Sequence, residues 1–215
     1  PEKIQKIVQG RIIPEVMVTS ITADISGLCH QRNVVAIGPG LGRTGEVKTL
    51  VQSVLTMCDN PLVIDADALY AMGHIGIVNQ EAVVSGDLNK LYSVSKSIPS
   101  CVMTPHLGEF SRLINMPVKW IERNYVIVAR AFAMAHNVVL VLKGIPSLVA
   151  LPDGTVYINT IGNSGMGTGG MGDVLTGVIS AFISQGYSLQ DSAVLGVYVH
   201  SRSADLLFDN RPWGY

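Results

Sequence analysis

Short apolar runs alternate along most of this chain with longer stretches whose apolar residues recur at helical spacing. The runs are rich in β-branched residues and predict buried strands at 33–38, 61–65, 101–104 and 138–143. The helical spacing predicts helices at about 45–57, 170–184 and 189–207. Because helical stretches separate the strands, the pattern predicts a parallel α/β sheet that binds ligands at the carboxyl ends of its strands.

A hairpin is predicted to end the sheet. Two apolar runs, 148–151 and 155–159, flank Pro152-Asp153-Gly154, which has the composition of a tight turn. The hairpin gives the mostly parallel sheet an antiparallel edge. The segment 74–99 is the least regular part of the chain and is expected to be a surface excursion.

The domain organisation is simple, because no internal repeat or linker divides the chain, and one domain over residues 1–215 is predicted. Residues 1–8 have the pattern of a helix that should follow a strand, but no strand precedes them in the sequence. We therefore expect this domain to lack an N-terminal strand-helix segment.

Composition narrows the classes of protein. Apolar residues make up 48% of the chain and charged residues 14%, which indicates heavy burial in a covered sheet or a homo-oligomer. No run of 18 apolar residues lacks a charge, so no membrane span is expected. The 15 basic and 16 acidic residues do not indicate a nucleic-acid-binding protein. Cys29, Cys58 and Cys101 show no paired spacing and favour reduced core thiols in a cytoplasmic protein.

The most informative segment for function is Gly162–Asp173, which contains six glycines and leads into a predicted helix. A glycine-rich loop before a helix gathers backbone N–H groups at the positive end of the helix dipole, where an anion binds. Glycine also lets the backbone approach a phosphate closely. Asp173, in the first helical turn, would lie beside that anion as a base. The segment therefore predicts a phosphoryl-transfer site.

Two common phosphate-binding motifs are excluded. Residues 167–172 match Gly-x-Gly-x-x-Gly, but a dinucleotide-binding fold has this motif after its first strand and an acidic residue at the end of its second strand. Here the motif lies late, and Asp191 falls between two predicted helices. A Walker A loop requires Lys-Ser or Lys-Thr after the glycines, and neither is present.

Other candidate residues follow the predicted strands and should meet at one edge of the sheet. Gly38-Pro-Gly-Leu-Gly42 follows the first strand and either lets backbone approach a ligand or forms a tight turn. Asp67 is predicted to cap the next helix. Asp65 either has a structural role or holds a metal-bound water or a substrate hydroxyl.

Two further strand ends carry polar side chains. Either Thr104 or His106 caps the helix that follows the third strand, and His106 is favoured as a ligand contact. Glu109 suits the positive end of the same helix. At the end of the fourth strand, either Lys143 meets a phosphate as a point charge or Gly144 lets the backbone pass a nucleotide. The structural alternative is that Lys143 is a surface lysine.

Taken together, these motifs resemble those of the ADP/ATP-dependent NAD(P)H-hydrate dehydratases, a family of the ribokinase-like superfamily. The resemblance rests on five segments in order along the chain, at residues 38–42, 65–69, 104–110, 142–144 and 162–177. It implies a three-layer α/β/α fold of the ribokinase-like type, with a mostly parallel central sheet and an antiparallel edge hairpin. It also implies a carbon–oxygen lyase that repairs NADH or NADPH hydrated on the nicotinamide ring.

In that family a nucleotide phosphorylates the ring hydroxyl, and elimination of phosphate regenerates NADH or NADPH. By resemblance, Asp173 is the base that deprotonates the hydroxyl. The anion hole that holds the transferring phosphoryl group consists of the amides of Gly170, Met171 and Gly172.

The resemblance also implies the ligand contacts. The hydrated dinucleotide contacts Gly42 and His106 together with Asp173. The phosphate donor is ADP or ATP, accompanied by Mg²⁺. It contacts Gly172 and the segment Lys143-Gly144-Ile145-Pro146-Ser147.

The chain also departs from the family pattern. Gly167 stands where Ala is commoner, and Ser147 stands where Thr is commoner. Family members carry an N-terminal glycine-containing segment that contributes to the substrate pocket. A ribokinase-like kinase of a vitamin precursor or sugar has the same loop and aspartate, so it remains an alternative. A non-catalytic nucleotide-binding module or inactive fragment is the second alternative.

Overall fold

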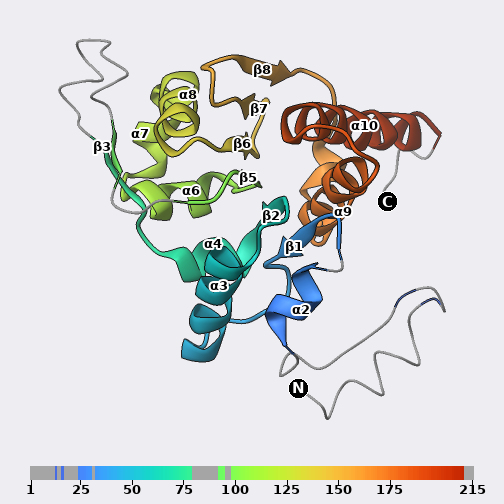
Figure 1. Ribbon diagram of the computed structural model, residues 1–215. Helices are drawn as coiled ribbons and strands as arrows, with labels where there is room; N and C mark the ends of the chain where they lie inside the picture. Colours follow the sequence, from blue (N-terminus) through green and yellow to red (C-terminus); the bar gives the residue numbers. More distant parts are fainter. Residues whose placement is uncertain are drawn as a thin grey trace.

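The computed structural model describes residues 13, 16, 24–30, 32–78, 92–94 and 98–210. Its centre is a six-stranded sheet in the order β1-β2-β5-β6-β7-β8 (Figure 1). The parallel strands are β1 (Val35–Ile37), β2 (Leu62–Ile64), β5 (Cys101–Met103) and β6 (Val139–Leu142). A hairpin of β7 (Ser147–Ala150) and β8 (Val156–Asn159) adds the antiparallel edge. The predicted sheet and its edge hairpin are therefore confirmed.

Helices cover both faces of the sheet because its strands are apolar on both sides. In β2, Leu62 and Ile64 belong to one core cluster and Val63 to the other, as the alternation of side chains along a strand requires. The first cluster packs the sheet against α3 (Gly45–Met57), α4 (Ala66–Met72), α6 (Leu107–Ile114), α7 (Val118–Arg123) and α8 (Tyr125–His136). The second packs it against α9 (Met171–Ser184) and α10 (Leu189–Asn210) (Figure 1). The predicted three-layer α/β/α arrangement is confirmed.

Local signals in the sequence explain several element boundaries. The Thr44 side chain caps α3 by accepting from the amide of Val47 at 3.4 Å, and α3 has the predicted bounds. Gly154 adopts φ +88° in the turn between β7 and β8.

The segment 74–99, expected to be a surface excursion, contains β3 (Gly76–Val78) and β4 (Tyr92–Val94), which pair in antiparallel fashion. The helix predicted at 1–8 lies outside the described residues.

The cysteine prediction is wrong for two of the three residues. A disulfide joins Cys29, in α2 (Ile25–His30), to Cys58, which caps the end of α3. The two helices pack together and bring the Cα atoms of these cysteines to 5.7 Å, although 29 positions separate them in the sequence. Cys101 is a free thiol inside β5, where burial raises its pKa to about 12.

Among the described helices, none is both long and apolar enough to cross a membrane.

Candidate functional site

The motifs that follow the parallel strands lie side by side at the carboxyl edge of the sheet. The amide of Asp65 donates to the carbonyl of Ile37 at 3.0 Å, and the amide of Thr104 donates to the carbonyl of Ile64 at 3.0 Å. Residues 106 and 143 form a further parallel bridge beyond the strands. The ladder thus continues past the strand ends and brings together segments from four parts of the chain.

The glycine-rich loop reaches this edge through a short 3₁₀ helix, η2 (Ser164–Gly167), and then enters α9. Gly170 occupies the N-cap position of α9 with φ +92°, and it offers the first turn no side-chain acceptor. The amide of Met171 donates to the carbonyl of Thr168 at 3.3 Å. Positive charge from the α9 dipole is therefore directed at the loop, although one of the three predicted anion-hole amides already has a partner.

Asp173 lies in the first turn of α9 and is exposed. Its position at the end of the glycine-rich loop is the one that the sequence predicts. As an exposed side chain at the start of the helix that the loop enters, it can act as a base on a group bound at the loop.

Lys143 and Asp65 form an ion pair next to the same turn. The Lys143 Nζ atom donates to Asp65 Oδ1 at 2.8 Å, and Asp65 Oδ2 accepts from the Thr176 hydroxyl at 2.9 Å. Glu109 Oε2 lies 4.0 Å from the same Nζ atom. Both oxygens of Asp65 are thus engaged by the protein, and its carboxylate is almost fully buried. Of the two alternatives for Asp65, the structure favours the structural one.

His106 has the capping role that the sequence offered as one alternative, whereas Thr104 is buried and does not cap α6. The His106 Nδ1 atom accepts from the amide of Gly108 at 3.0 Å, and the Glu109 side chain accepts from the amide of His106 at 2.8 Å. This capping box requires a ring proton on Nε2. The ring is 59% exposed, so it remains accessible from solvent at the edge of the site.

Gly42 lies at the same edge, with φ +82°. Its amide donates to Asp67 Oδ2 at 2.9 Å, and Arg43 Nε donates to Asp67 Oδ1 at 3.0 Å. The prediction that Asp67 caps α4 is wrong, because Asp65 holds the N-cap position and Asp67 lies in the first helical turn. The Asp67 side chain instead reaches back to the loop after β1, a contact between residues 25 apart that no local pattern indicates.

The predicted nucleotide segment leads from β6 into β7. The Ser147 hydroxyl donates to the carbonyl of Gly144 at 3.0 Å and closes a tight loop, whose tip, Ile145, is fully exposed. The Tyr125 hydroxyl donates to the carbonyl of Leu142 at 3.1 Å and would lie 2.4 Å from a Cβ atom at Gly144. Burial raises the pKa of Tyr125 to about 12. A side chain at Gly144 would therefore displace the Tyr125 hydroxyl from its bond to Leu142.

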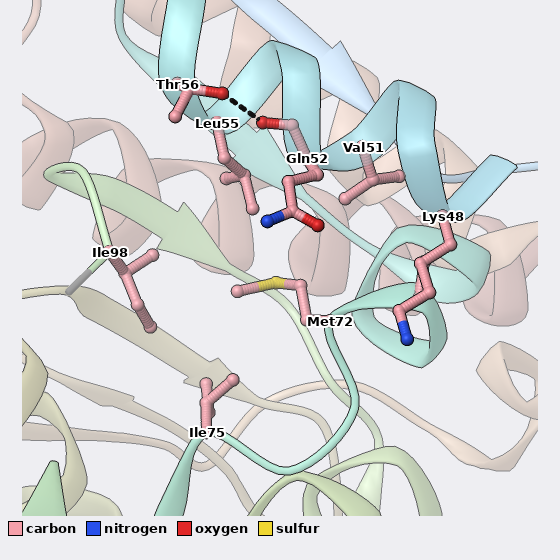
Figure 2. Close-up of a pocket in the computed structure, with 9 residues that line it drawn as sticks. Lys48, Val51, Gln52, Leu55, Thr56, Met72, Ile75 and Ile98 are labelled. Carbon is pink, nitrogen blue, oxygen red and sulfur yellow. Dashed lines mark hydrogen bonds between the residues drawn. The ribbon is translucent and has the colours of Figure 1, made fainter. Parts of the chain in front are cut away.

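A cavity of about 330 Å³ lies apart from these residues, between α3 and α4 (Figure 2). Its lining is largely apolar, and the predicted site residues do not contribute to it. It is lined by Lys48, Val51, Gln52, Leu55, Thr56, Ala71, Met72, Ile75 and Ile98. The sequence motifs gave no signal for this cavity, because its residues follow the ordinary apolar pattern of a core-facing helix.

Comparison with known proteins agrees with the motifs. Residues 2–215 match the family described as NAD(P)H-hydrate dehydratase. The ADP-dependent (S)-NAD(P)H-hydrate dehydratase of Neisseria meningitidis is 32% identical over 196 residues, which are 90% of this chain and 61% of that protein. A bifunctional NAD(P)H-hydrate repair enzyme of Moorella thermoacetica is 39% identical over 80% of this chain and 30% of its own length. The chain thus spans less than two thirds of these curated relatives.

Solved structures show the same relationship. The ADP/ATP-dependent NAD(P)H-hydrate dehydratase of Bacillus subtilis, co-crystallized with ATP and Mg²⁺, is 32% identical. It superposes with a TM-score of 0.66, covering 82% of this chain and 56% of that chain. A ribokinase-like superfamily protein of Enterococcus faecalis gives a TM-score of 0.65 at 27% identity, over 86% of this chain and 58% of its own. The match over residues 2–215 shows that the chain belongs to the NAD(P)H-hydrate dehydratase family.

Proposed function

We propose that the protein dehydrates hydrated NADH and NADPH with a nucleotide as phosphate donor. One observation carries the proposal: a glycine-rich loop opens onto α9 with Asp173 in the first helical turn and the Lys143–Asp65 pair beside it. This arrangement combines a base, a helix N-terminus and a fixed positive charge, as phosphoryl transfer requires.

Each residue then has a defined task in the reaction. Asp173 takes the proton from the ring hydroxyl, whose oxygen attacks the terminal phosphorus of the nucleotide as the bond to the leaving nucleotide breaks. The amides of Gly170 and Gly172 and the Lys143 ammonium stabilise the phosphoryl oxygens. The amide of Met171 joins them once it turns from the Thr168 carbonyl. The ring C–O bond next breaks with loss of phosphate and of a proton from the adjacent ring carbon, which restores the ring double bond.

Ligand contacts are assigned at the same edge of the sheet. Gly42 and His106 contact the hydrated dinucleotide, since both lie in the segments that follow parallel strands at the carboxyl edge of the sheet. The adenine nucleotide lies along residues 143–147. Tyr125 holds the start of this segment, through Leu142, and the Ser147 hydroxyl closes it.

We propose that a magnesium ion arrives with the nucleotide. Within the described ranges, no three His, Cys, Asp or Glu side chains gather as a metal-binding group. Mg²⁺ commonly keeps several waters and binds one or two carboxylates together with substrate phosphates. ADP or ATP would therefore supply most of its ligands, and the ion would neutralise phosphate charge. We also propose that the protein forms a homo-oligomer, as its apolar composition indicates. A cytoplasmic location is proposed from its dehydratase relatives, which act on hydrated NAD(P)H, and not from its cysteines, two of which form a disulfide.

The direct test uses the full-length protein with hydrated NADH and either ADP or ATP with Mg²⁺. Return of NADH absorbance is expected, together with release of one phosphate per NADH formed. Omission of the nucleotide should abolish the signal. Phosphate transfer to an alcohol-bearing vitamin precursor or a sugar, without recovery of NADH, would assign the protein to the ribokinase-like kinases instead.

The Asp173→Asn variant tests the catalytic assignment. Loss of the base should lower kcat by about 10²–10⁴-fold, while nucleotide affinity is not weakened because Asn carries no charge to repel phosphate. Asp191→Asn is the matched control, since Asp191 occupies the first turn of the neighbouring α10. The control should keep its turnover. An Asp173→Asn variant with wild-type kcat would contradict the assignment.

A further inference from the structure

Asp65 is a buried carboxylate that the proposed reaction does not use. It is 1% exposed, and its two oxygens accept from Lys143 and Thr176. These partners come from the end of β6 and from α9, which lie 78 and 111 positions away in the sequence. A buried ion pair is weak evidence for stability, because desolvation offsets much of its attraction. The two bonds of Asp65 are therefore better explained by a role in fixing the positions of Lys143 and Thr176.

The Lys143 ammonium lies against the first turn of α9. Its Nζ atom would be 3.2 Å from a Cβ atom at Gly172, so a glycine at this position lets the ammonium approach the helix. Gly172 and Thr176 are four residues apart and share one face of α9. Asp65 contacts this face twice, directly through Thr176 and indirectly through Lys143.

The ammonium keeps hydrogen-bonding capacity for a ligand. An ammonium group has three N–H donors, and Asp65 takes one of them at 2.8 Å. Glu109 Oε2 lies at 4.0 Å, beyond hydrogen-bonding distance. The Lys143 side chain is 22% exposed, so it is not closed off from solvent. Asp65, in contrast, is closed to solvent.

We propose that Asp65 is a positioning residue for anion binding. It fixes the Lys143 ammonium against the first turn of α9 and, through Thr176, fixes that turn on the sheet. The charge of Lys143 and the amides of residues 170–172 then act on the same phosphate oxygens. The identity of the anion as a nucleotide phosphate rests on the proposed function, whereas the positioning itself rests on the contacts of Asp65.

A double-mutant cycle in the full-length protein tests the proposal. Asp65→Asn keeps the shape of the side chain but removes its charge, and Lys143→Met removes the ammonium. Each single variant should weaken binding of ATP with Mg²⁺, measured by titration calorimetry, by about 10- to 100-fold, as expected for loss of a charge-assisted bond. Because Asp65 acts mainly through Lys143, the double variant should bind within about twofold of Lys143→Met. A double variant whose fold-loss of ATP affinity equals the product of the two single fold-losses would overturn the proposal.

Variants at Thr176 keep the proposal testable if a single charge variant does not fold. Thr176→Val removes one bond to Asp65 and leaves the ion pair, and it should lower both ATP affinity and kcat several-fold. Thr176→Ser keeps the hydroxyl and should restore both quantities. Thr176→Val with wild-type binding and kcat would overturn the part of the proposal in which Asp65 fixes the first turn of α9 through Thr176. Asp59→Asn, at an exposed carboxylate after α3, controls for loss of a charge and should change neither quantity.

Nucleotide binding separates this inference from the proposed reaction. Wild-type protein that binds ATP with Mg²⁺ but regenerates no NADH would overturn the dehydratase function. The calorimetric double-mutant cycle would still test the role of Asp65, because it measures nucleotide affinity alone. Wild-type protein that binds no ATP with Mg²⁺ would overturn the inference itself.

Discussion

Gly38 is required by a contact within the protein. Its φ is +137°, and a Cβ atom there would lie 1.7 Å from the carbonyl oxygen of Asp65. The chain after β1 therefore passes against the backbone that follows β2, and only glycine leaves room for this approach. Of the two alternatives for the segment 38–42, the structural one explains Gly38, because the close approach is to the protein's own backbone. Gly40 also has a positive φ, +71°, but a Cβ atom there would have open space.

The two glycines give a matched pair of variants. Gly38→Ala should lower the free energy of unfolding by about 3 kcal/mol or more, because the clash is with backbone that cannot rotate away. Gly40→Ala should cost only about 1–2 kcal/mol, the penalty for a left-handed conformation in a residue with a Cβ atom. Urea unfolding measures both values. Equal losses would show that the Asp65 contact does not decide the choice of glycine.

At the scale of elements, α10 anchors the glycine-rich loop. Asp205 accepts from the amide of Gly162 at 3.0 Å and from the Asn163 side chain at 2.9 Å. One turn earlier, Ser201 accepts from the Asn159 side chain at 2.9 Å, at the end of β8. The same face of one helix thus holds the last strand and the start of the loop, which sets where the loop begins its path to α9.

The stability that Asp205 contributes through these hydrogen bonds should depend on pH. The hydrogen bonds from Asn163 and from the amide of Gly162 hold the pKa of Asp205 below its ordinary value. Its contribution to stability is therefore complete above the ordinary carboxyl pKa of about 3.9 and is lost as the pH falls through the lowered value. Asp205→Asn should lower Tm near neutral pH and make little difference in strong acid. Asp209→Asn, one turn further along α10, is the control.

A deficit in Tm for Asp205→Asn that does not shrink as the pH falls below the ordinary carboxyl pKa would contradict this account, because the wild-type carboxyl progressively loses its charge there. Asp209→Asn should follow the wild-type curve throughout the series.

Elements that depend on neighbouring residues were predictable, whereas contacts between distant segments were not. The strands, the bounds of α3 and the β7–β8 turn follow from apolar period and turn composition. The same local patterns predicted the loop and Asp173 in the first turn of α9. They could not indicate that Asp65 pairs with Lys143 or that Cys29 meets Cys58, because packing alone brings these residues together.

At the scale of the whole molecule, the sheet separates two apolar cores. The larger core includes α8, and His136 at the end of that helix packs on Phe132 with ring centroids 4.4 Å apart. Only 4% of His136 is exposed. Burial lowers its pKa from 6.5 to about 4 because the charged ring is poorly solvated there. Folding therefore keeps this imidazole neutral at pH values where an unfolded chain would protonate it.

Global stability should consequently fall in mild acid. A lowered folded pKa means that the unfolded chain binds the proton first, so stability declines as the pH drops from about 6.5 to about 4. The shift corresponds to a loss of about 3 kcal/mol. His136→Leu should remove most of this slope in urea unfolding at pH 7, 5.5 and 4. Burial also lowers the pKa of His200, which should leave a smaller slope of the same sign.

An unchanged slope in His136→Leu would place the acid sensitivity elsewhere in the molecule. A variant with alanine at His200, compared over the same pH series, would then show whether that residue accounts for the decline.

The bonds of Asp65 to Lys143 and Thr176 also have a consequence for synthesis. They close chain segments of 78 and 111 residues, and contacts of such long range form late because the entropy of closing the loop opposes them. The proposed anion site therefore cannot form in a nascent chain until residue 176 has left the ribosome. An anion bound at that site would stabilise the finished sheet and not the earlier steps of folding.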